Sequence, residues 1–126
     1  MRAGYVDTSC FVAIAFGESE GAAVARRIDA LAGVFASNLL EAELRAAFAR
    51  EGVGYDARLL DGVTWVLPDH PLHGEIGRVV SAGYVRGADL WHLAVALYLA
   101  GSPSDLDFVT LDERQRDVAE RLGFSV

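Results

Sequence analysis

The sequence predicts an α/β fold in which helices cover both faces of a mostly parallel sheet. Short apolar runs typical of buried strands alternate along the chain with longer segments of helical periodicity. No repeat, low-complexity tract or linker rich in Pro, Gly or Ser interrupts this alternation. With 126 residues, 52% of them hydrophobic, the chain fits one compact domain, 1–126, around a single core.

The order of the expected elements follows from hydrophobic periodicity and from capping signals. Apolar runs predict the strands, whereas apolar residues three and four apart predict the helices. Ser37 is the expected N-cap of the third helix. The expected strands cover residues 3–6, 34–36, 63–67, 107–110 and 124–126, and the expected helices cover residues 8–16, about 20–31, 38–51, 71–82, 87–100 and 112–121.

Charge and composition exclude several classes of protein. The net charge of −7 argues against a protein that holds nucleic acid by a basic surface alone, but not against a nuclease whose bound cations carry the positive charge. All 11 basic residues are arginines, so the chain has no lysine for a P-loop, a Schiff base or a serine–lysine pair. The Gly-rich fingerprint of dinucleotide binding is also missing.

The sequence also indicates the compartment. No stretch approaches the roughly 20 apolar residues of a membrane span, and Asp7 comes before a signal-peptide core could form. Cys10 is the only cysteine, which excludes an internal disulfide and fits a reducing environment. We therefore expect a cytoplasmic protein without a membrane segment.

Three aspartates lie where expected strands end or expected helices begin. Asp7 follows the first strand, Asp89 lies in the opening of the fifth helix, and Asp112 follows the fourth strand. Each can also be explained as a helix cap or a turn residue, and Asp112 with Gln115 three residues later mimics a capping box. His92, three residues past Asp89, is interpreted as a histidine at the edge of the core rather than as a metal ligand.

Glu43 is placed differently, on the apolar face of a helix. Leu39 and Ala47 lie four residues to either side of it, and Leu40 and Ala46 lie three residues away. The carboxylate is therefore expected in the middle of the buried stripe, where it is costly unless it is paired, protonated or bound to a cation. Satisfaction by a core arginine or by backbone amides is the alternative interpretation.

Taken together, the four acids point to one metal site. The carboxyl ends of parallel strands meet at one edge of a sheet, so we expect Asp7, Glu43, Asp89 and Asp112 to converge there. Carboxylates gathered in this way repel one another unless cations neutralise them. Oxygen ligands without a Cys/His cluster favour Mg²⁺ or Mn²⁺ over zinc.

Four segments in this order resemble the PIN domain and, among its members, the VapC toxins of bacterial VapBC toxin–antitoxin pairs. They are Tyr5-Val6-Asp7-Thr8-Ser9, the stretch 37–47, the stretch 86–94, and Phe108-Val109-Thr110-Leu111-Asp112. The closing stretch 119–124 is also similar to the last helix and strand of the family. The resemblance covers the whole chain.

The resemblance implies a three-layer α/β/α sandwich and an endoribonuclease that depends on Mg²⁺ or Mn²⁺. It implies RNA as the substrate, a VapB-type antitoxin as an inhibitor, and homodimers. The catalytic and metal-binding acids would be Asp7, Glu43, Asp89 and Asp112, with Ser9 and Thr110 as supporting residues. The stretch 100–107 is slightly long for the family, so Asp105 and Asp107 compete with Asp112 for the fourth position.

Other interpretations remain open from the sequence. Arg86 and Arg114 lie near the acids and are candidates for contacts with substrate phosphates, although ordinary surface solvation explains either one alone. An inactive PIN-like module that only binds a partner is one alternative to the nuclease. A metal-dependent phosphatase is another, but the haloacid-dehalogenase type needs a second aspartate two residues after the first, where this chain has Ser9.

Overall fold

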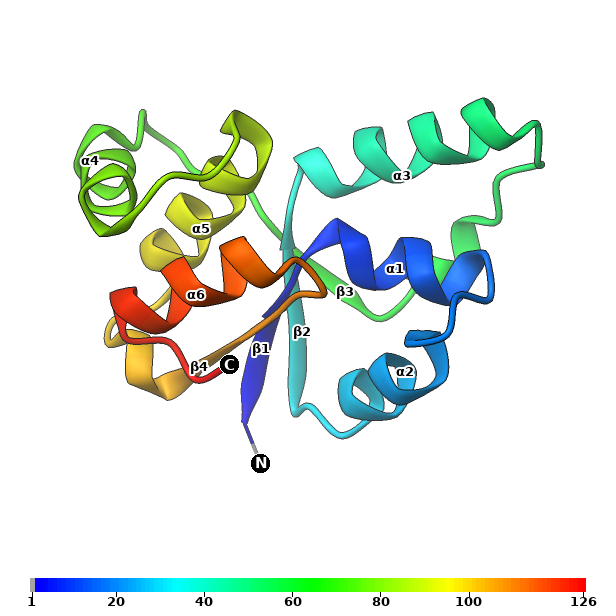
Figure 1. Ribbon diagram of the computed structural model, residues 1–126, viewed down its shortest axis with the longest axis horizontal. Helices are drawn as coiled ribbons and strands as arrows, with labels where there is room; N and C mark the ends of the chain where they lie inside the picture. The colour runs from blue at the N-terminus through cyan, green and yellow to red at the C-terminus, as the bar shows by residue number, and fades with distance from the viewer. Residues whose placement is uncertain (1) are drawn as a thin grey trace.

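The computed structural model describes residues 2–126 and contains a parallel sheet between two layers of helices (Figure 1). The sheet has four strands in the order β3-β2-β1-β4. This arrangement confirms the predicted α/β fold with a central parallel sheet. The strands are β1 (Ala3–Val6), β2 (Gly33–Ser37), β3 (Val63–Val66) and β4 (Leu106–Val109).

The helices divide between the two faces of the sheet (Figure 1). On one side lie α1 (Thr8–Ala15), α2 (Gly21–Asp29) and α3 (Leu39–Glu51), and on the other lie α4 (His73–Ala82), α5 (Gly87–Leu99) and α6 (Glu113–Leu122). Two short 3₁₀ helices, Ala57–Leu60 and Pro103–Asp105, lie in the connections. Among residues 2–126, no helix is long and apolar enough to cross a membrane.

Alternation along the strands builds two cores, one on each face. Tyr5 of β1 and Phe108 of β4 stack 5.4 Å apart and pack with the layer of α4, α5 and α6. Their neighbours Val6 and Val109 point to the opposite face and pack with the layer of α1 and α3. Strands buried on both faces account for the apolar runs in the sequence.

The strand order creates a crevice at the end of β1. From β1 the chain runs outward through β2 to β3, and it then returns to place β4 on the other side of β1. Such a reversal leaves a crevice beyond the carboxyl ends of the strands, which is where ligands bind in open α/β sheets. Asp7, the residue after β1, lies at this point.

Two local expectations are wrong. Residues 124–126 do not form a strand, because only one isolated bridge joins Ser125 to Asp107 of β4 and the segment is too short to extend the ladder. The N-cap of α3 is Asn38, without a side-chain cap, rather than Ser37. The Ser37 hydroxyl nevertheless accepts the Leu39 N–H (3.1 Å), so it still satisfies a free amide at this helix start.

Candidate active site

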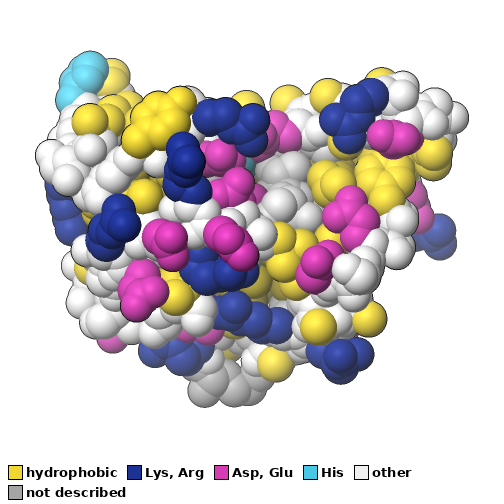
Figure 2. Space-filling view, in the orientation of Figure 1, with side chains coloured by type: hydrophobic (Ala, Val, Ile, Leu, Met, Phe, Trp, Pro, Cys, Tyr) yellow, Lys and Arg dark blue, Asp and Glu magenta, His cyan; other side chains and the backbone are white. Residues whose placement is uncertain are grey.

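The acids predicted from the sequence line one open pocket of about 770 Å³ at the carboxyl edge of the sheet. Figure 2 shows acidic side chains and arginines gathered around a hollow between the two helical layers. The acidic residues of the lining are Asp7, Glu18, Glu20, Glu43, Asp89, Asp112 and Glu113, and the basic ones are Arg50, Arg86 and Arg116. Acids outnumber arginines, so the pocket favours cations.

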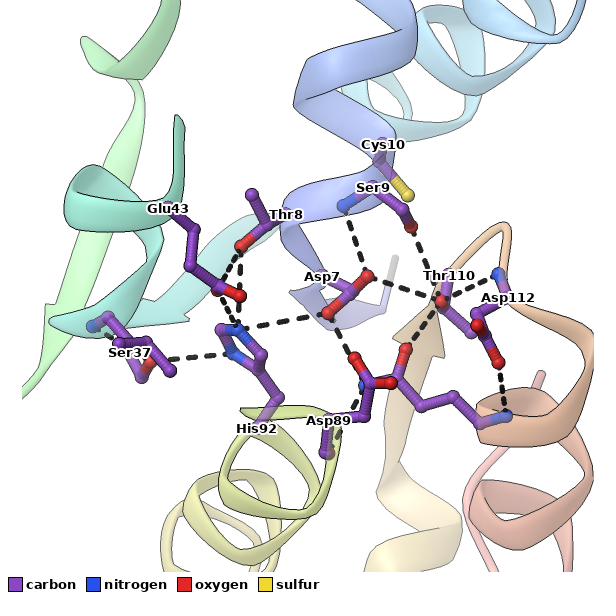
Figure 3. Close-up of polar contacts among 12 residues, drawn as sticks. Asp7, Thr8, Ser9, Cys10, Ser37, Glu43, Asp89, His92, Thr110 and Asp112 are labelled. Atoms are coloured by element: carbon purple, nitrogen blue, oxygen red, sulfur yellow. Dashed lines mark hydrogen bonds and ion pairs between the residues drawn. The ribbon is translucent and has the colours of Figure 1, made fainter. Parts of the chain in front are cut away.

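Asp7 is buried at the centre of this site, with 4% of its surface exposed (Figure 3). One carboxylate oxygen accepts the Ser9 N–H (3.0 Å), which caps α1, and lies 3.4 Å from the Thr110 hydroxyl. The other accepts from the Gln115 amide at 3.3 Å. Asp7 is therefore a helix cap, as the capping interpretation expects. The cap engages only one of its two carboxylate oxygens.

Asp89 is not a cap. The N-cap of α5 is Arg86, without a side-chain hydrogen bond, and Asp89 lies in the first turn of the helix. Its closest cation is the Arg86 guanidinium, 3.8 Å away and largely exposed. Burial raises the pKa of Asp89, and the nearby charges of Asp7 and Asp112 raise this pKa further against the opposing effect of Arg86. Asp89 is therefore repelled by two other acids of this pocket.

Asp112 is the N-cap of α6, as the capping-box interpretation expects. One carboxylate oxygen accepts the Gln115 N–H at 2.8 Å. Gln115 does not close the box, because its side chain reaches Asp7 and Thr110 instead. Of the two competitors for the fourth position, Asp107 pairs with Arg2 and Arg27, and neither Asp105 nor Asp107 lines the pocket in residues 2–126.

Glu43 lies at the edge of the buried face of α3 rather than in its middle. Leu40, Leu44, Ala47 and Phe48 are the buried residues of this helix, whereas Ala46 is exposed and 30% of the Glu43 side chain is accessible. The buried face of α3 is therefore rotated about the helix axis, by part of a turn, relative to the face predicted from the sequence. Glu43 consequently reaches both the core and the pocket.

His92 holds the Glu43 carboxylate. The ring is fully buried, and its Nε2 donates to Glu43 Oε1 at 2.6 Å (Figure 3). The Thr8 hydroxyl donates to the same oxygen at 2.7 Å. Burial acts to raise the pKa of Glu43, but the hydrogen bonds from His92 and Thr8 outweigh it and hold this pKa below its usual value. Glu43 is therefore a carboxylate in the folded protein.

Tyr5 fixes the orientation of His92 from the other side. Its hydroxyl lies 2.6 Å from Nδ1 of His92 and accepts the Ser37 N–H at 3.1 Å. Burial raises the pKa of Tyr5 far above its usual range, so the phenol keeps its proton. Nε2 of His92 carries the proton of the hydrogen bond to Glu43, because a carboxylate can only accept.

Ser9 and Thr110 connect the segments that follow β1 and β4 by hydrogen bonds. Ser9 Oγ accepts the Leu111 N–H at 3.1 Å and lies 3.4 Å from Thr110 Oγ1. Thr110 donates to the buried Gln115 side chain at 2.6 Å and accepts the Asp112 N–H at 3.1 Å. This polar layer fixes the backbone from which Asp7 and Asp112 project.

Arg86 and Arg114 lie beside the acids, as expected from the sequence. Arg86 is 81% exposed at the rim of the acidic pocket, and Arg114 lines a smaller pocket that adjoins it. Arg116 was not predicted from the sequence; it lines the acidic pocket and donates to the Thr110 carbonyl at 2.7 Å. The roles of Thr8, Gln115 and His92 were not predicted either. The available signal for His92 was a histidine among the apolar residues that follow Asp89 in α5.

The carboxylate oxygens of the pocket are ligands of the type that a hard divalent cation prefers. Asp7, Asp89 and Asp112 offer carboxylate oxygens in one pocket, and the charges of the other two act against the ionisation of Asp89. Within residues 2–126, however, no three His, Cys, Asp or Glu side chains stand close enough to hold a metal ion as they are. Hydrogen bonds engage Asp7 and Asp112, and Glu43 is turned to His92. A cation would therefore be held only after side chains rotate within the pocket.

Comparison with known proteins identifies the family. The family model of the PIN domain matches residues 4–121. Neither a search of curated proteins nor a search of solved structures found a match. PIN domains are in general nucleases, and they typically use divalent metal ions. Because the match spans nearly the whole sequence and includes all four acids, the chain belongs to the PIN-domain family.

Proposed function

We propose that this protein is an endoribonuclease that depends on Mg²⁺ or Mn²⁺ and acts at the pocket of Asp7, Asp89 and Asp112. The observation that carries the proposal is the convergence of these three aspartates, from β1, α5 and the start of α6, on one open pocket. The pKa of Asp89, raised by burial and then by the charges of the other two, supports it, because a cation would relieve that repulsion.

The three aspartates would hold the cation, and Glu43 would support it from the opposite wall. When bound, such an ion lowers the pKa of a water molecule and neutralises charge on the phosphate. The residues of the chain would position the cation and the substrate phosphate. Asp7 accepts from the Ser9 N–H and from the Gln115 amide, which hold its carboxylate at the centre of the pocket. Arg86 offers a guanidinium at the rim, where it would orient a phosphate.

We also propose that the protein is the toxin of a VapBC pair and forms homodimers. Support comes from the likeness of its segments to VapC toxins along the whole chain. The open pocket leaves room for a polymer substrate, and its excess of acids is complementary to an arginine of a VapB-type antitoxin. In cells, expression of the wild-type protein should arrest growth, whereas the Asp89→Asn variant should not. Growth arrest by Asp89→Asn at equal protein levels would contradict the toxin assignment.

The test is RNA cleavage by purified protein freed of any partner. Structured and unstructured RNAs are incubated with Mg²⁺, Mn²⁺ or EDTA. Wild-type protein should cleave only with metal, and Asp7→Asn and Asp89→Asn should lose at least about 100-fold in rate, the order expected when several kcal/mol of charge stabilisation are removed. Asp105→Asn is the matched control, since Asp105 lies outside the pocket, and it should cleave normally.

The alternatives give different results in the same assay. Cleavage by Asp7→Asn and Asp89→Asn at the wild-type rate would contradict the proposed site. If the wild-type protein cleaved no RNA and bound no Mn²⁺, the chain would be an inactive PIN-like module. Hydrolysis of phosphate monoesters without cleavage of RNA would instead identify a phosphatase.

A further inference from the structure

One large aromatic side chain at the edge of the active site lies outside the hydrophobic core. Tyr84 lies in the connection between α4 and α5 and is 72% exposed. Its neighbour Val85 is only 5% exposed and belongs to the core, so it anchors the connection and leaves Tyr84 projecting outward. Folding therefore explains Val85 but not an aromatic ring in solvent one residue before it.

Tyr84 adjoins the proposed catalytic pocket. It lines a second pocket of about 270 Å³, together with Val85, Arg86, Asp89, Asp112 and Arg114. Arg86, Asp89 and Asp112 also line the acidic pocket. The two pockets therefore share one wall, and a ligand in the smaller one would lie beside two of the proposed catalytic acids.

The ring is already paired with a guanidinium. Arg114, in the first turn of α6, lies over the Tyr84 ring with 5.6 Å between its Cζ and the ring centroid. An aromatic ring and an arginine plane are the two surfaces on which proteins stack unpaired bases. The remaining lining is charged except for Val85, which disfavours an apolar peptide side chain as the occupant.

We propose that Tyr84 and Arg114 form a subsite for an unpaired nucleobase of a single-stranded RNA, adjacent to the phosphate that is cleaved. The proposal rests on the proposed nuclease function and names its substrate form. A stacked base would hold the strand in register while Arg86, between the two pockets, contacts the linking phosphate. A stacking surface selects single strands over duplexes, because paired bases do not expose their faces.

A binding experiment with two probes tests the subsite separately from catalysis. The first probe is a fluorescent oligouridylate about 12 nucleotides long, within the range of single-strand binding sites, and the second is the same ribose-phosphate chain without bases. Fluorescence anisotropy measures the Kd of each in Ca²⁺, another hard cation that binds carboxylate oxygens. The difference between the probes isolates the contribution of the bases.

Tyr84→Ala should weaken binding of the oligouridylate by roughly 5- to 100-fold, the effect of losing one base–aromatic stack. It should leave binding of the abasic chain unchanged, and Tyr84→Phe should bind both probes as the wild type does. Val80→Ala is the control for an exposed apolar residue of α4, since Val80 is 59% exposed and lines neither pocket. It should change neither Kd.

Arginine variants test the second half of the subsite. Arg114→Ala should also weaken oligouridylate binding more than binding of the abasic chain. Arg45→Ala removes a matched arginine, which lies 5.1 Å over the Tyr55 ring and lines neither pocket, and should leave both Kd values unchanged. An equal loss for both probes in Arg114→Ala would show a phosphate contact and overturn its role in stacking.

The outcomes separate the subsite from the nuclease. If Tyr84→Ala binds the oligouridylate as tightly as the wild type, or weakens both probes equally, the nucleobase subsite is wrong, and metal-dependent cleavage of RNA by the wild type would still support the nuclease. If the wild type binds neither probe and cleaves no RNA, the nuclease proposal fails and the subsite fails with it.

Discussion

At the scale of single residues, the site depends on how each carboxylate is held. Glu43 and Asp89 show the contrast. Hydrogen bonds from His92 and Thr8 more than offset the burial of Glu43 and lower its pKa, whereas burial and two like charges raise the pKa of Asp89. One acid is thus stabilised as an anion by the protein alone, and the other remains without a sufficient counter-charge.

The buried His92 should be required for the orientation of Glu43. His92→Leu removes the donor to Glu43 and the hydrogen-bond partner of Tyr5, so we expect a loss of about 1–3 kcal/mol in the free energy of unfolding. Activity should fall by about 10- to 100-fold, as for other side chains that orient metal ligands. His92→Gln, which keeps a donor, should recover part of both. Chemical denaturation and cleavage rates of the two variants provide the measurement. Equal activity of His92→Leu and wild type would contradict this role.

Asp89→Asn should stabilise the metal-free protein at neutral pH. Because the pKa of Asp89 is raised in the folded state, the charged form disfavours folding, and this penalty disappears as the pH falls and the carboxyl group is protonated. The free energy of unfolding of the variant should exceed that of the wild type near pH 7 and approach it near pH 4, close to the ordinary pKa of aspartate. Urea denaturation in EDTA at both pH values measures this.

The control for this stability effect is Asp69→Asn, which removes a carboxylate that is 82% exposed. It should show no such pH-dependent gain. If Asp89→Asn were less stable than wild type at neutral pH, the carboxylate would be making a favourable contact that the present account lacks.

Sequence patterns located the acids but not the partners that hold them. Asp7, Asp89 and Asp112 follow from their positions at strand ends and helix starts, because the chain itself marks those boundaries. His92 and Gln115 reach Glu43, Thr110 and Asp7 across gaps of 5 to 108 positions, and hydrophobic periodicity carries no information on such contacts. The exposure of Glu43 was also misjudged, since α3 is rotated by part of a turn.

At the scale of elements, helix starts serve the site and the fold at once. Asp7 caps α1 and Asp112 caps α6, and both line the pocket. The capping interpretation and the catalytic interpretation of these residues are therefore compatible. The alternation of strands and helices was predictable because strands buried on both faces and amphipathic helices differ in period. The isolated bridge at Ser125 was not, because a run of three apolar or small residues does not fix its pairing.

Two substitutions at Asp112 separate its two roles. Asp112→Asn keeps a good N-cap, whereas Asp112→Ala removes it and should cost about 1 kcal/mol of stability. Both remove the carboxylate, so both should lose RNA cleavage to the same extent. Thermal denaturation and cleavage rates of the pair provide the measurement. Full activity in Asp112→Asn would exclude Asp112 as the fourth acid of the site.

At the scale of the whole molecule, the strand order brings together acidic residues that lie far apart in the sequence. Residues 7, 89 and 112 line one pocket because β4 returns beside β1, which puts the loop after β4 and the start of α5 at the same edge. The net charge of −7 makes this edge unfavourable for a polyanion unless cations and a few arginines offset it. The binding of an RNA substrate should therefore depend both on bound cations and on the arginines of the pocket.

Arg86→Ala should weaken RNA binding in a salt-dependent way. Each phosphate contact with a single strand contributes about 0.7 to the slope of log K against log salt, and the variant should lose about one such contact. Binding titrations at several salt concentrations measure the slope. Arg78→Ala of α4, which lines neither site pocket, is the control and should keep the wild-type slope. An unchanged slope for Arg86→Ala would show that this guanidinium does not contact the strand.

Calorimetric titration with Mn²⁺ tests the central claim most directly, namely that three aspartates from distant segments form a cation site. The wild-type protein should bind Mn²⁺, Asp7→Asn and Asp89→Asn should lose this binding, and Asp105→Asn should retain it. If the wild type bound no Mn²⁺, or if Asp7→Asn and Asp89→Asn bound it as tightly as the wild type, the pocket would not be a metal centre and the proposed mechanism would be wrong.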